Sequence, residues 1–176
     1  MEIKFFNSNF DKITQNKDTD QSITNLIEKL PSLNIVSDKN LLEETIKISN
    51  QFKEKKEKII VFGTGGSNLG ARALNNIISN NKIILEFYDN VDPINFEKNF
   101  QNINFELTGF LVISKSGTTP ETLSQFSCLY QKAIEANKVE DFFSNTLIIT
   151  EFKESPLFKI AKDNNCLLLE LSLIHI

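Results

Sequence analysis

The segment IIVFGTGGSNLGARAL, residues 59–74, passes from a run of apolar residues through a glycine-rich turn into a stretch of helical periodicity. An apolar run without polar alternation is typical of a strand that is buried on both faces of a sheet. Four glycines, at positions 63, 65, 66 and 70, surround Ser67 in the turn. A strand that enters a helix in this way is the repeating unit of α/β proteins, so the segment predicts that fold class.

The chain beyond this segment repeats the same alternation. The expected strands are Lys58–Gly63, Lys82–Tyr88, Gly109–Ser114, Asn145–Thr150 and Cys166–Leu171. The expected helices lie at about 67–79, 93–101, 119–137 and 155–164. Three of them begin with a capping residue followed by proline: Asp92-Pro93, Thr119-Pro120 and Ser155-Pro156. Strands that alternate with helices predict right-handed crossovers and a five-stranded, doubly wound parallel sheet.

The amphipathic patterns predict which helix faces are buried. For the helix that begins at Thr119, the expected buried stripe is Leu123, Phe126, Ser127, Tyr130 and Ile134. Before the sheet domain, which we expect over residues 58–176, residues 1–57 predict a helical extension. Its clear part is an amphipathic helix over residues 39–56, with the apolar side at Leu41, Thr45, Ile48 and Phe52, and Leu42 and Ile46 beside it. Residues 7–20 are polar and predict a loop or a short helix.

Composition excludes several classes of protein. The 176 residues are 40% hydrophobic and 24% charged, as in ordinary globular proteins. A net charge of −4 gives no field that would attract nucleic acid or an anionic membrane. The N-terminus has no long apolar stretch, so we expect no signal peptide and no membrane span. Cys128 and Cys166 show no CxxC spacing, which argues against a zinc site or a disulfide scaffold and favours a cytoplasmic protein without a metal.

The segment LVISKSGTTPET, residues 111–122, is unusually rich in hydroxyl groups where a strand gives way to a helix. Its polar residues are Ser114, Lys115, Ser116, Thr118 and Thr119, with Gly117 among them. A helix N-terminus ringed by hydroxyls and one lysine can hold a phosphate group. The alternative is a turn whose hydroxyls merely cap the helix, but one cap needs only one hydroxyl. The segment therefore predicts a phosphate-binding loop.

The glycine-rich turn at residues 63–70 has four possible interpretations. As a dinucleotide-binding motif that begins at Gly63, it would need glycine where Asn68 stands, which disfavours a nucleotide-binding Rossmann domain. As a P-loop counted from Gly65, it would need lysine where Ala71 stands. The remaining interpretations are a tight turn packed on the sheet and a turn whose backbone approaches a ligand. We expect Gly66 to lie against the ligand or to adopt a positive φ.

The sequence offers no evident catalytic residue beside this binding loop. Its one histidine, His175, is one residue from the end of the sequence and is interpreted as incidental. No carboxylate is marked by its neighbours as a general base. The sequence thus predicts a phosphate-binding half-site without the groups for proton transfer.

Three segments resemble one known family. FGTGGSNLGARAL at 62–74 and VISKSGTTPETL at 112–123 resemble the two signatures of the first sugar-isomerase (SIS) domain of phosphoglucose isomerases. TEFKESPLFKIAKDNN at 150–165 resembles the segment that follows in the bacterial branch. The similarity spans about residues 59–170. It implies an SIS-type, flavodoxin-like sheet and interconversion of glucose 6-phosphate and fructose 6-phosphate through a cis-enediol, in glycolysis and gluconeogenesis. It also implies a homodimeric full-length enzyme without metal or nucleotide cofactor.

The resemblance also assigns roles to individual residues. It implies that Gly66 and Ser67 contact the substrate, and that Gly117 and Thr118 shape the phosphate loop. The residues that would hold the phosphate are Ser114, Lys115, Ser116 and Thr119. The family's arginine, its glutamate base, its ring-opening histidine and a further lysine have no counterpart here. We therefore expect an amino-terminal fragment without catalytic residues, whose last residues, SLIHI at 172–176, match nothing in the family.

A stand-alone sugar-phosphate-sensing regulatory domain is the alternative function. Such sensors act on a partner or on an attached DNA-binding module. Residues 1–58 carry ten lysines and ten acidic residues and no basic helix for DNA. This balance favours the enzyme over the regulator and predicts no nucleic-acid partner.

Overall fold

The computed structural model describes residues 21, 23–25, 37–78 and 82–171. They contain a five-stranded sheet in the order β2-β1-β3-β4-β5, in which every neighbouring pair is parallel. The strands are β1 (Lys58–Phe62), β2 (Ile84–Tyr88), β3 (Thr108–Ile113), β4 (Thr146–Thr150) and β5 (Leu167–Glu170). The predicted sheet is confirmed, and its order is the flavodoxin-like one.

Six helices lie within residues 37–78 and 82–171. They are α3 (Lys39–Lys53), α4 (Gly66–Ile77), α5 (Pro93–Asn99), α6 (Pro120–Glu135), α7 (Val139–Ser144) and α8 (Pro156–Asp163). Helix α7 was not predicted, because its six residues are too few to show a helical period. It nevertheless buries Phe142 completely at the centre of an aromatic cluster.

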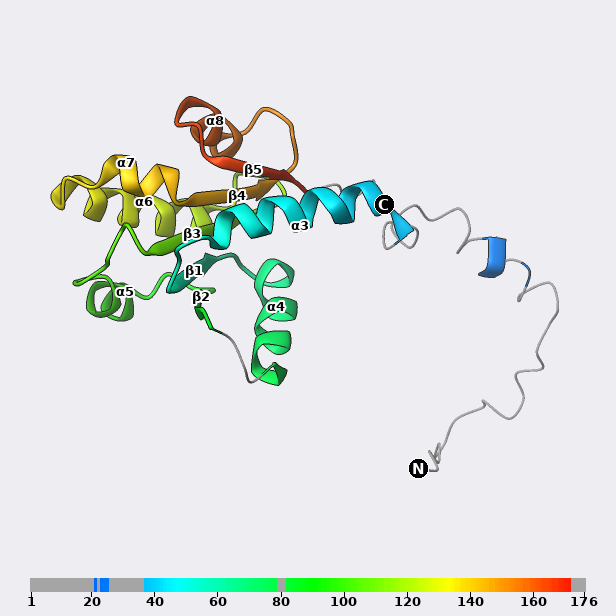
Figure 1. Ribbon diagram of the computed structural model, residues 1–176, viewed down its shortest axis with the longest axis horizontal. Helices are drawn as coiled ribbons and strands as arrows, with labels where there is room; N and C mark the ends of the chain where they lie inside the picture. The colour runs from blue at the N-terminus through cyan, green and yellow to red at the C-terminus, as the bar shows by residue number, and fades with distance from the viewer. Residues whose placement is uncertain (1–20, 22, 26–36, 79–81, 172–176) are drawn as a thin grey trace. The chain divides into compact units, whose positions relative to one another are not determined.

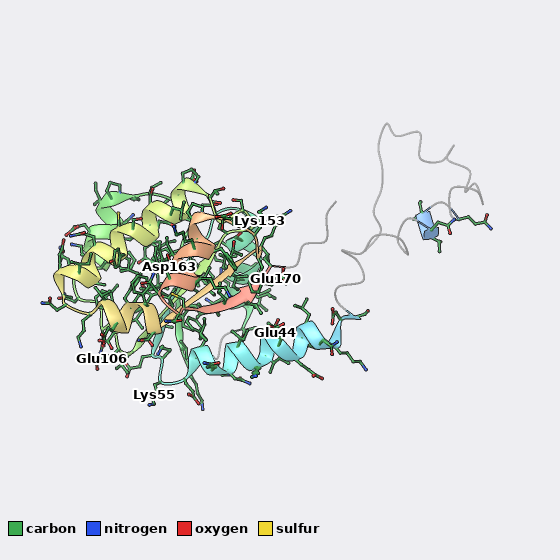
Figure 2. The ribbon with its side chains drawn as sticks, turned by 90° about the horizontal axis from the view of Figure 1, so that it is seen from above. Glu44, Lys55, Glu106, Lys153, Asp163 and Glu170 are labelled. Atoms are coloured by element: carbon green, nitrogen blue, oxygen red, sulfur yellow. The ribbon has the colours of Figure 1, made fainter. Side chains whose placement is uncertain are left out.

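The helices form two layers around the sheet (Figure 1). Helices α5 to α8 cover one face, where Phe62, Phe110 and Leu129 belong to the larger apolar core. Helices α3 and α4 lie on the other face, where Phe52 of α3 packs with Ile59 and other apolar residues of the strands. The charged residues that are labelled in Figure 2 are all exposed. None of the helices in the described residues is long and apolar enough to cross a membrane.

The outer strands are less buried than predicted. All residues of β1 except Lys58 are buried, as expected of a central strand. In β2, however, no residue is fully buried, and Ile84 is 61% exposed. The prediction that every strand is buried on both faces was wrong for β2 because this strand lies at the edge of the sheet, where it has one neighbour instead of two.

The buried side of α6 differs from the predicted stripe. Its buried residues are Thr122, Gln125, Phe126, Leu129 and Ala133. Leu123 and Tyr130 are only partly buried, whereas Ser127 and Ile134 are exposed. The apolar pattern failed because two of the inward positions, Thr122 and Gln125, are polar.

The predicted helix before the sheet is confirmed as α3, which ends three residues earlier than expected. Its Phe52 lies over Gly109 of β3, where an added Cβ would be 2.8 Å from the ring. Leu42 and Ile46 remain more than half exposed. Residues Asn40–Ser172 form one compact unit, which includes nearly all of α3. The expected loop or short helix at residues 7–20 lies outside the described residues, and the domain boundary after residue 57 stays a prediction.

The stability of the compact unit Asn40–Ser172 is expected to decrease at alkaline pH because of the buried thiol of Cys166. Burial raises the pKa of its thiol from 9.0 to about 11. The folded protein therefore keeps this proton where the unfolded chain loses it, so the stabilisation is complete below pH 9 and is lost as the pH rises towards 11. We expect the free energy of unfolding to fall by roughly 2 kcal/mol more in the parent than in Cys166→Ala across this interval. Urea unfolding at pH 7, 9 and 10.5 measures this difference, and parallel pH profiles would refute it.

Candidate phosphate-binding site

Two loops meet where the strand order reverses. Strand β1 lies between β2 and β3, and its last residue, Phe62, is in register with Val112 of β3. The two strands therefore end at the same edge, and Gly63 and Ser114 begin the loops that follow them. A Cβ added to Gly63 would lie 3.4 Å from the Ile113 carbonyl oxygen, so the loops touch. In open α/β sheets this position outside the carboxyl ends of the strands is where ligands bind.

The glycine-rich loop is shaped by Gly65 and Asn68. Gly65 has a φ of 53° and stands at the N-cap of α4 without a side-chain cap. The Asn68 side chain is completely buried, and its Nδ2 donates to the Gly63 carbonyl oxygen at 3.0 Å. Asn68, the residue that disfavours the dinucleotide motif, thus fixes the conformation of this turn through its buried side chain.

Gly66 and Ser67, the expected substrate contacts, lie at the start of α4. The positive φ that we expected at Gly66 belongs to Gly65 instead, and that part of the prediction was wrong. A Cβ added to Gly66 would meet no atom within 4 Å, so its surroundings are open to a ligand. Ser67 is half-buried, and its amide donates to the Thr64 carbonyl oxygen at 3.2 Å. The helix that these residues begin directs its positive dipole end towards this region.

In the second loop the four hydroxyl groups are arranged as two pairs. Ser114 Oγ lies 2.8 Å from Thr119 Oγ1, and it also accepts the Gly117 amide at 3.2 Å. Ser116 Oγ accepts from Thr118 Oγ1 at 2.9 Å and from the Thr118 amide at 3.2 Å. Ser114 is 3% exposed, whereas Thr118 faces solvent. The loop therefore has an inner pair of hydroxyls, Ser114 with Thr119, and a more exposed outer pair, Ser116 with Thr118.

The three predicted capping residues all stand at the N-cap of a helix, and two of them cap it through their side chains. Asp92 accepts the amides of Ile94 and Asn95, and Ser155 accepts the amide of Phe158. Thr119 makes no side-chain cap to α6 because its hydroxyl is bonded to Ser114. Pro120 still begins the helix as predicted. Thr119 is therefore the N-cap residue that the sequence predicted, but it lacks the side-chain hydrogen bond of a cap.

A third segment, the turn between β4 and α8, forms hydrogen bonds to the backbone of the second loop, residues 114–119, which we call the hydroxyl loop. The Lys115 carbonyl oxygen accepts from the Glu151 amide at 3.2 Å and from Thr150 Oγ1 at 3.3 Å. The Gly117 carbonyl oxygen accepts from the Leu157 amide at 3.2 Å. Gly117 itself has a φ of 65°, and a Cβ there would lie 2.8 Å from Ser155 Cβ and closer still to Ser155 Oγ. Sequence reasoning identified Ser155 only as a helix cap and missed this supporting role.

The charges near the loop are two lysines around one carboxylate. Lys115 Nζ lies 3.9 Å from Glu151 Oε1, and Lys153 forms an ion pair with the other oxygen of the same carboxylate. The Glu151 side chain is 15% exposed, whereas the Lys115 side chain is 55% exposed. The exposed Lys115 ammonium is therefore the cation that the loop itself can offer to an anion, whereas Glu121 in the first turn of α6 adds a negative charge nearby.

These features together suit anion binding better than proton transfer. Two helix N-termini, four hydroxyls and a lysine converge at the switch point, and each can donate to phosphate oxygens. Glu151, whose carboxylate lies beside Lys115 of the loop, is already paired with two lysines. Glu121 stands in the first turn of α6, where a negative charge complements the helix dipole. His175 lies outside the described residues.

Comparison with known proteins agrees with this arrangement. The sequence model of the phosphoglucose isomerase family matches residues 18–168. The glucose-6-phosphate isomerase of Prochlorococcus marinus is 35% identical over 125 residues, which cover 69% of this chain and 23% of that protein. The enzyme of the same name from Borreliella burgdorferi is 34% identical over 126 residues, 68% of this chain and 23% of that protein. The chain thus spans about a quarter of the length of the curated relatives that it matches.

A solved structure shows the same fold. The crystal structure of a glucose-6-phosphate isomerase from Chlamydia trachomatis superposes with a TM-score of 0.63 at 24% identity, over 73% of this chain and 25% of that chain. The sugar isomerase domain of an RpiR transcription factor from Sphaerobacter thermophilus superposes with a TM-score of 0.53 at 19% identity, over 88% of this chain and 75% of that chain. The family predicted from the two loop motifs is confirmed, since its sequence model covers both loops: the chain belongs to the phosphoglucose isomerase family.

Proposed function

We propose that this chain forms the sugar-phosphate-binding part of a glucose-6-phosphate isomerase, which interconverts glucose 6-phosphate and fructose 6-phosphate through a cis-enediol. The observation that carries the proposal is the hydroxyl loop at the start of α6, which the turn after β4 holds through backbone hydrogen bonds to Lys115 and Gly117. Ser114, Lys115, Ser116 and Thr119 hold the phosphate, and Gly117 and Thr118 shape the loop around it. Gly66 and Ser67 contact the sugar.

The proposed binding mode follows from where the donors lie. A phosphate dianion at the start of α6 takes hydrogen bonds from hydroxyls that otherwise bond to each other, Ser114 with Thr119 and Ser116 with Thr118. The Lys115 side chain is exposed, and its ammonium group is only loosely paired with Glu151, at 3.9 Å. The ammonium group can therefore turn from Glu151 towards the anion. The sugar then extends towards α4, whose glycine-rich start leaves room for it.

The proposal includes the pathway, the cellular compartment and the oligomeric state of the intact enzyme. In the intact enzyme the activity belongs to glycolysis and gluconeogenesis in the cytoplasm, needs no metal or nucleotide cofactor, and is carried by a homodimer. Sugar phosphate is the proposed partner, with neither nucleic acid nor membrane involved.

Removing two phosphate donors tests the proposal. In Ser116→Ala/Thr119→Ala, each lost hydroxyl removes a hydrogen bond worth about 1 kcal/mol, so the affinity for fructose 6-phosphate should fall about thirtyfold. Titration calorimetry measures the affinity. Ser124→Ala/Ser127→Ala is the matched control, because both hydroxyls are exposed on the same helix and should not affect binding. Equal affinity of the two double variants would rule out the proposed phosphate site.

A further inference from the structure

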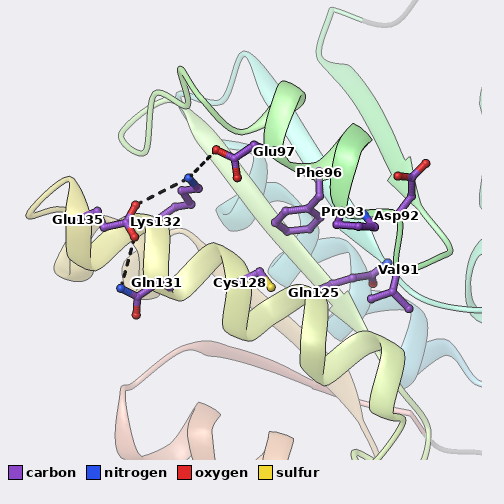
Figure 3. A pocket seen from close by; sticks show the side chains of 10 residues that line it. All are labelled: Val91, Asp92, Pro93, Phe96, Glu97, Gln125, Cys128, Gln131, Lys132 and Glu135. Atoms are coloured by element: carbon purple, nitrogen blue, oxygen red, sulfur yellow. Dashed lines mark hydrogen bonds and ion pairs between the residues drawn. The ribbon is translucent and has the colours of Figure 1, made fainter.

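A groove of about 490 Å³ lies between α5 and α6 (Figure 3). None of its lining residues belongs to the two loops of the candidate phosphate site. Its apolar part is formed by Val91, Pro93 and Phe96, and Phe96 projects from α5 towards α6. Cys128 lines the opposite side and is exposed. The groove is thus large enough for a compact apolar molecule.

The buried polar group in this groove is Gln125. Its residue is 1% exposed, and its Nε2 donates to the Asn90 carbonyl oxygen at 2.7 Å. This bond fixes the orientation of the amide, because the reverse orientation would place two oxygens against each other. The Oε1 atom has no hydrogen-bond partner among the described residues. Buried amide oxygens in proteins are nearly always bonded, so this acceptor indicates a donor that comes from outside the described residues.

The charged rim restricts what that donor can belong to. Lys132 Nζ lies 3.2 Å from Glu97 Oε1 and 3.8 Å from Glu135 Oε2. Asp92 at the start of α5 adds a third carboxylate to the lining. Three carboxylates against one lysine repel anions, so sugar phosphates do not fit this groove.

We infer that the groove between α5 and α6 binds a small, flat, apolar molecule that is neutral or cationic and donates one hydrogen bond to Gln125 Oε1. The apolar body lies against Val91, Pro93 and Phe96, and the N–H or O–H group satisfies the buried acceptor. This site is separate from the proposed sugar-phosphate function and does not depend on it.

Indole is a suitable probe, because it is planar, neutral and apolar and has a single N–H donor. Binding is measured by the rate at which Ellman's reagent labels Cys128 at pH 8. The chain has only two cysteines, and burial raises the pKa of Cys166 to about 11, so Cys128 supplies the fast reaction. Indole should slow this reaction at least fivefold at saturation, with half-protection on the order of 1 mM for a ligand of this size. 1-Methylindole has the same ring without the donor and should need at least a fivefold higher concentration.

Variants of two glutamines complete the test. Gln125→Met keeps the length of the side chain but removes the acceptor, so it should abolish the difference between indole and 1-methylindole. Gln131→Met changes an exposed residue on the groove's rim and should preserve that difference. If Gln125→Met fails to fold, the comparison of the two probes on the parent chain still decides. No protection by indole up to its solubility limit, or equal protection by both probes, would overturn the inference.

Discussion

Replacing Gly117 by alanine is expected to weaken fructose 6-phosphate binding at least tenfold and to lower the free energy of unfolding by roughly 2–5 kcal/mol. Two independent costs contribute. Gly117 has a φ of 65°, a conformation that strains any residue with a Cβ. The added methyl group would also lie 2.8 Å from Ser155 Cβ and 3.1 Å from Thr150 Oγ1. Both neighbours are buried, so they cannot move aside into solvent.

The loss of binding follows from how Gly117 connects two segments. Its carbonyl oxygen accepts from the Leu157 amide, and its own amide is bonded to Ser114. A backbone shift at Gly117 would therefore displace the hydroxyls on either side of it. Calorimetry with fructose 6-phosphate and urea unfolding measure the two effects.

Gly70→Ala is the matched control for this substitution. Position 70 lies inside α4, and an added Cβ would meet no atom within 4 Å. Alanine there should stabilise the helix by about 0.5–1 kcal/mol and leave binding unchanged. If Gly117→Ala behaves like Gly70→Ala, the close packing between the phosphate loop and Ser155 has no role in binding.

The 176-residue chain by itself should bind sugar phosphates but interconvert them at least 10⁴-fold more slowly than the intact glucose-6-phosphate isomerase of a relative. Aldose–ketose isomerisation needs a base that moves a proton between neighbouring carbons, and a positioned base or acid contributes about 10²–10⁴-fold. Ring opening requires further groups. In the described residues Glu151, an acid beside the phosphate loop, is engaged by Lys115 and Lys153. A phosphate cradle binds substrate and transition state about equally, and such uniform binding does not raise turnover.

A coupled assay of glucose 6-phosphate formed from fructose 6-phosphate measures this rate. The Prochlorococcus marinus enzyme, assayed at the same molar concentration, provides the reference. Turnover within tenfold of that enzyme would show that the catalytic groups are among residues 1–176 and that the assigned roles are wrong.

The features that sequence could predict are those that depend on near neighbours in the chain. The apolar run at Ile59–Phe62 and the proline after Asp92, Thr119 and Ser155 each specify local structure, and the sheet and helix starts follow from them. The position of the hydroxyl loop beside the glycine-rich turn also follows, because parallel strands end at a common edge.

The features that sequence could not predict depend on residues distant in the chain. Ser155 has an evident role as a cap, but its contact with Gly117 exists only once β4 lies beside β3. Thr119 carries the same local signal as the other two caps, yet its hydroxyl bonds to Ser114 across the loop. Gln125 is polar, so the sequence pattern did not predict it on the buried side of α6. There its side-chain amide donates a hydrogen bond to the Asn90 carbonyl oxygen.

The central claim is that sugar phosphate binds where the loops after β1 and β3 meet. The most direct test is a titration of the ¹⁵N-labelled chain with fructose 6-phosphate, followed by the backbone amide resonances. The account predicts saturable shifts that are largest for residues 64–68 and 114–119, with small changes at the α5–α6 groove. No shifts in these two loops at millimolar ligand, or larger shifts at the groove, would contradict it.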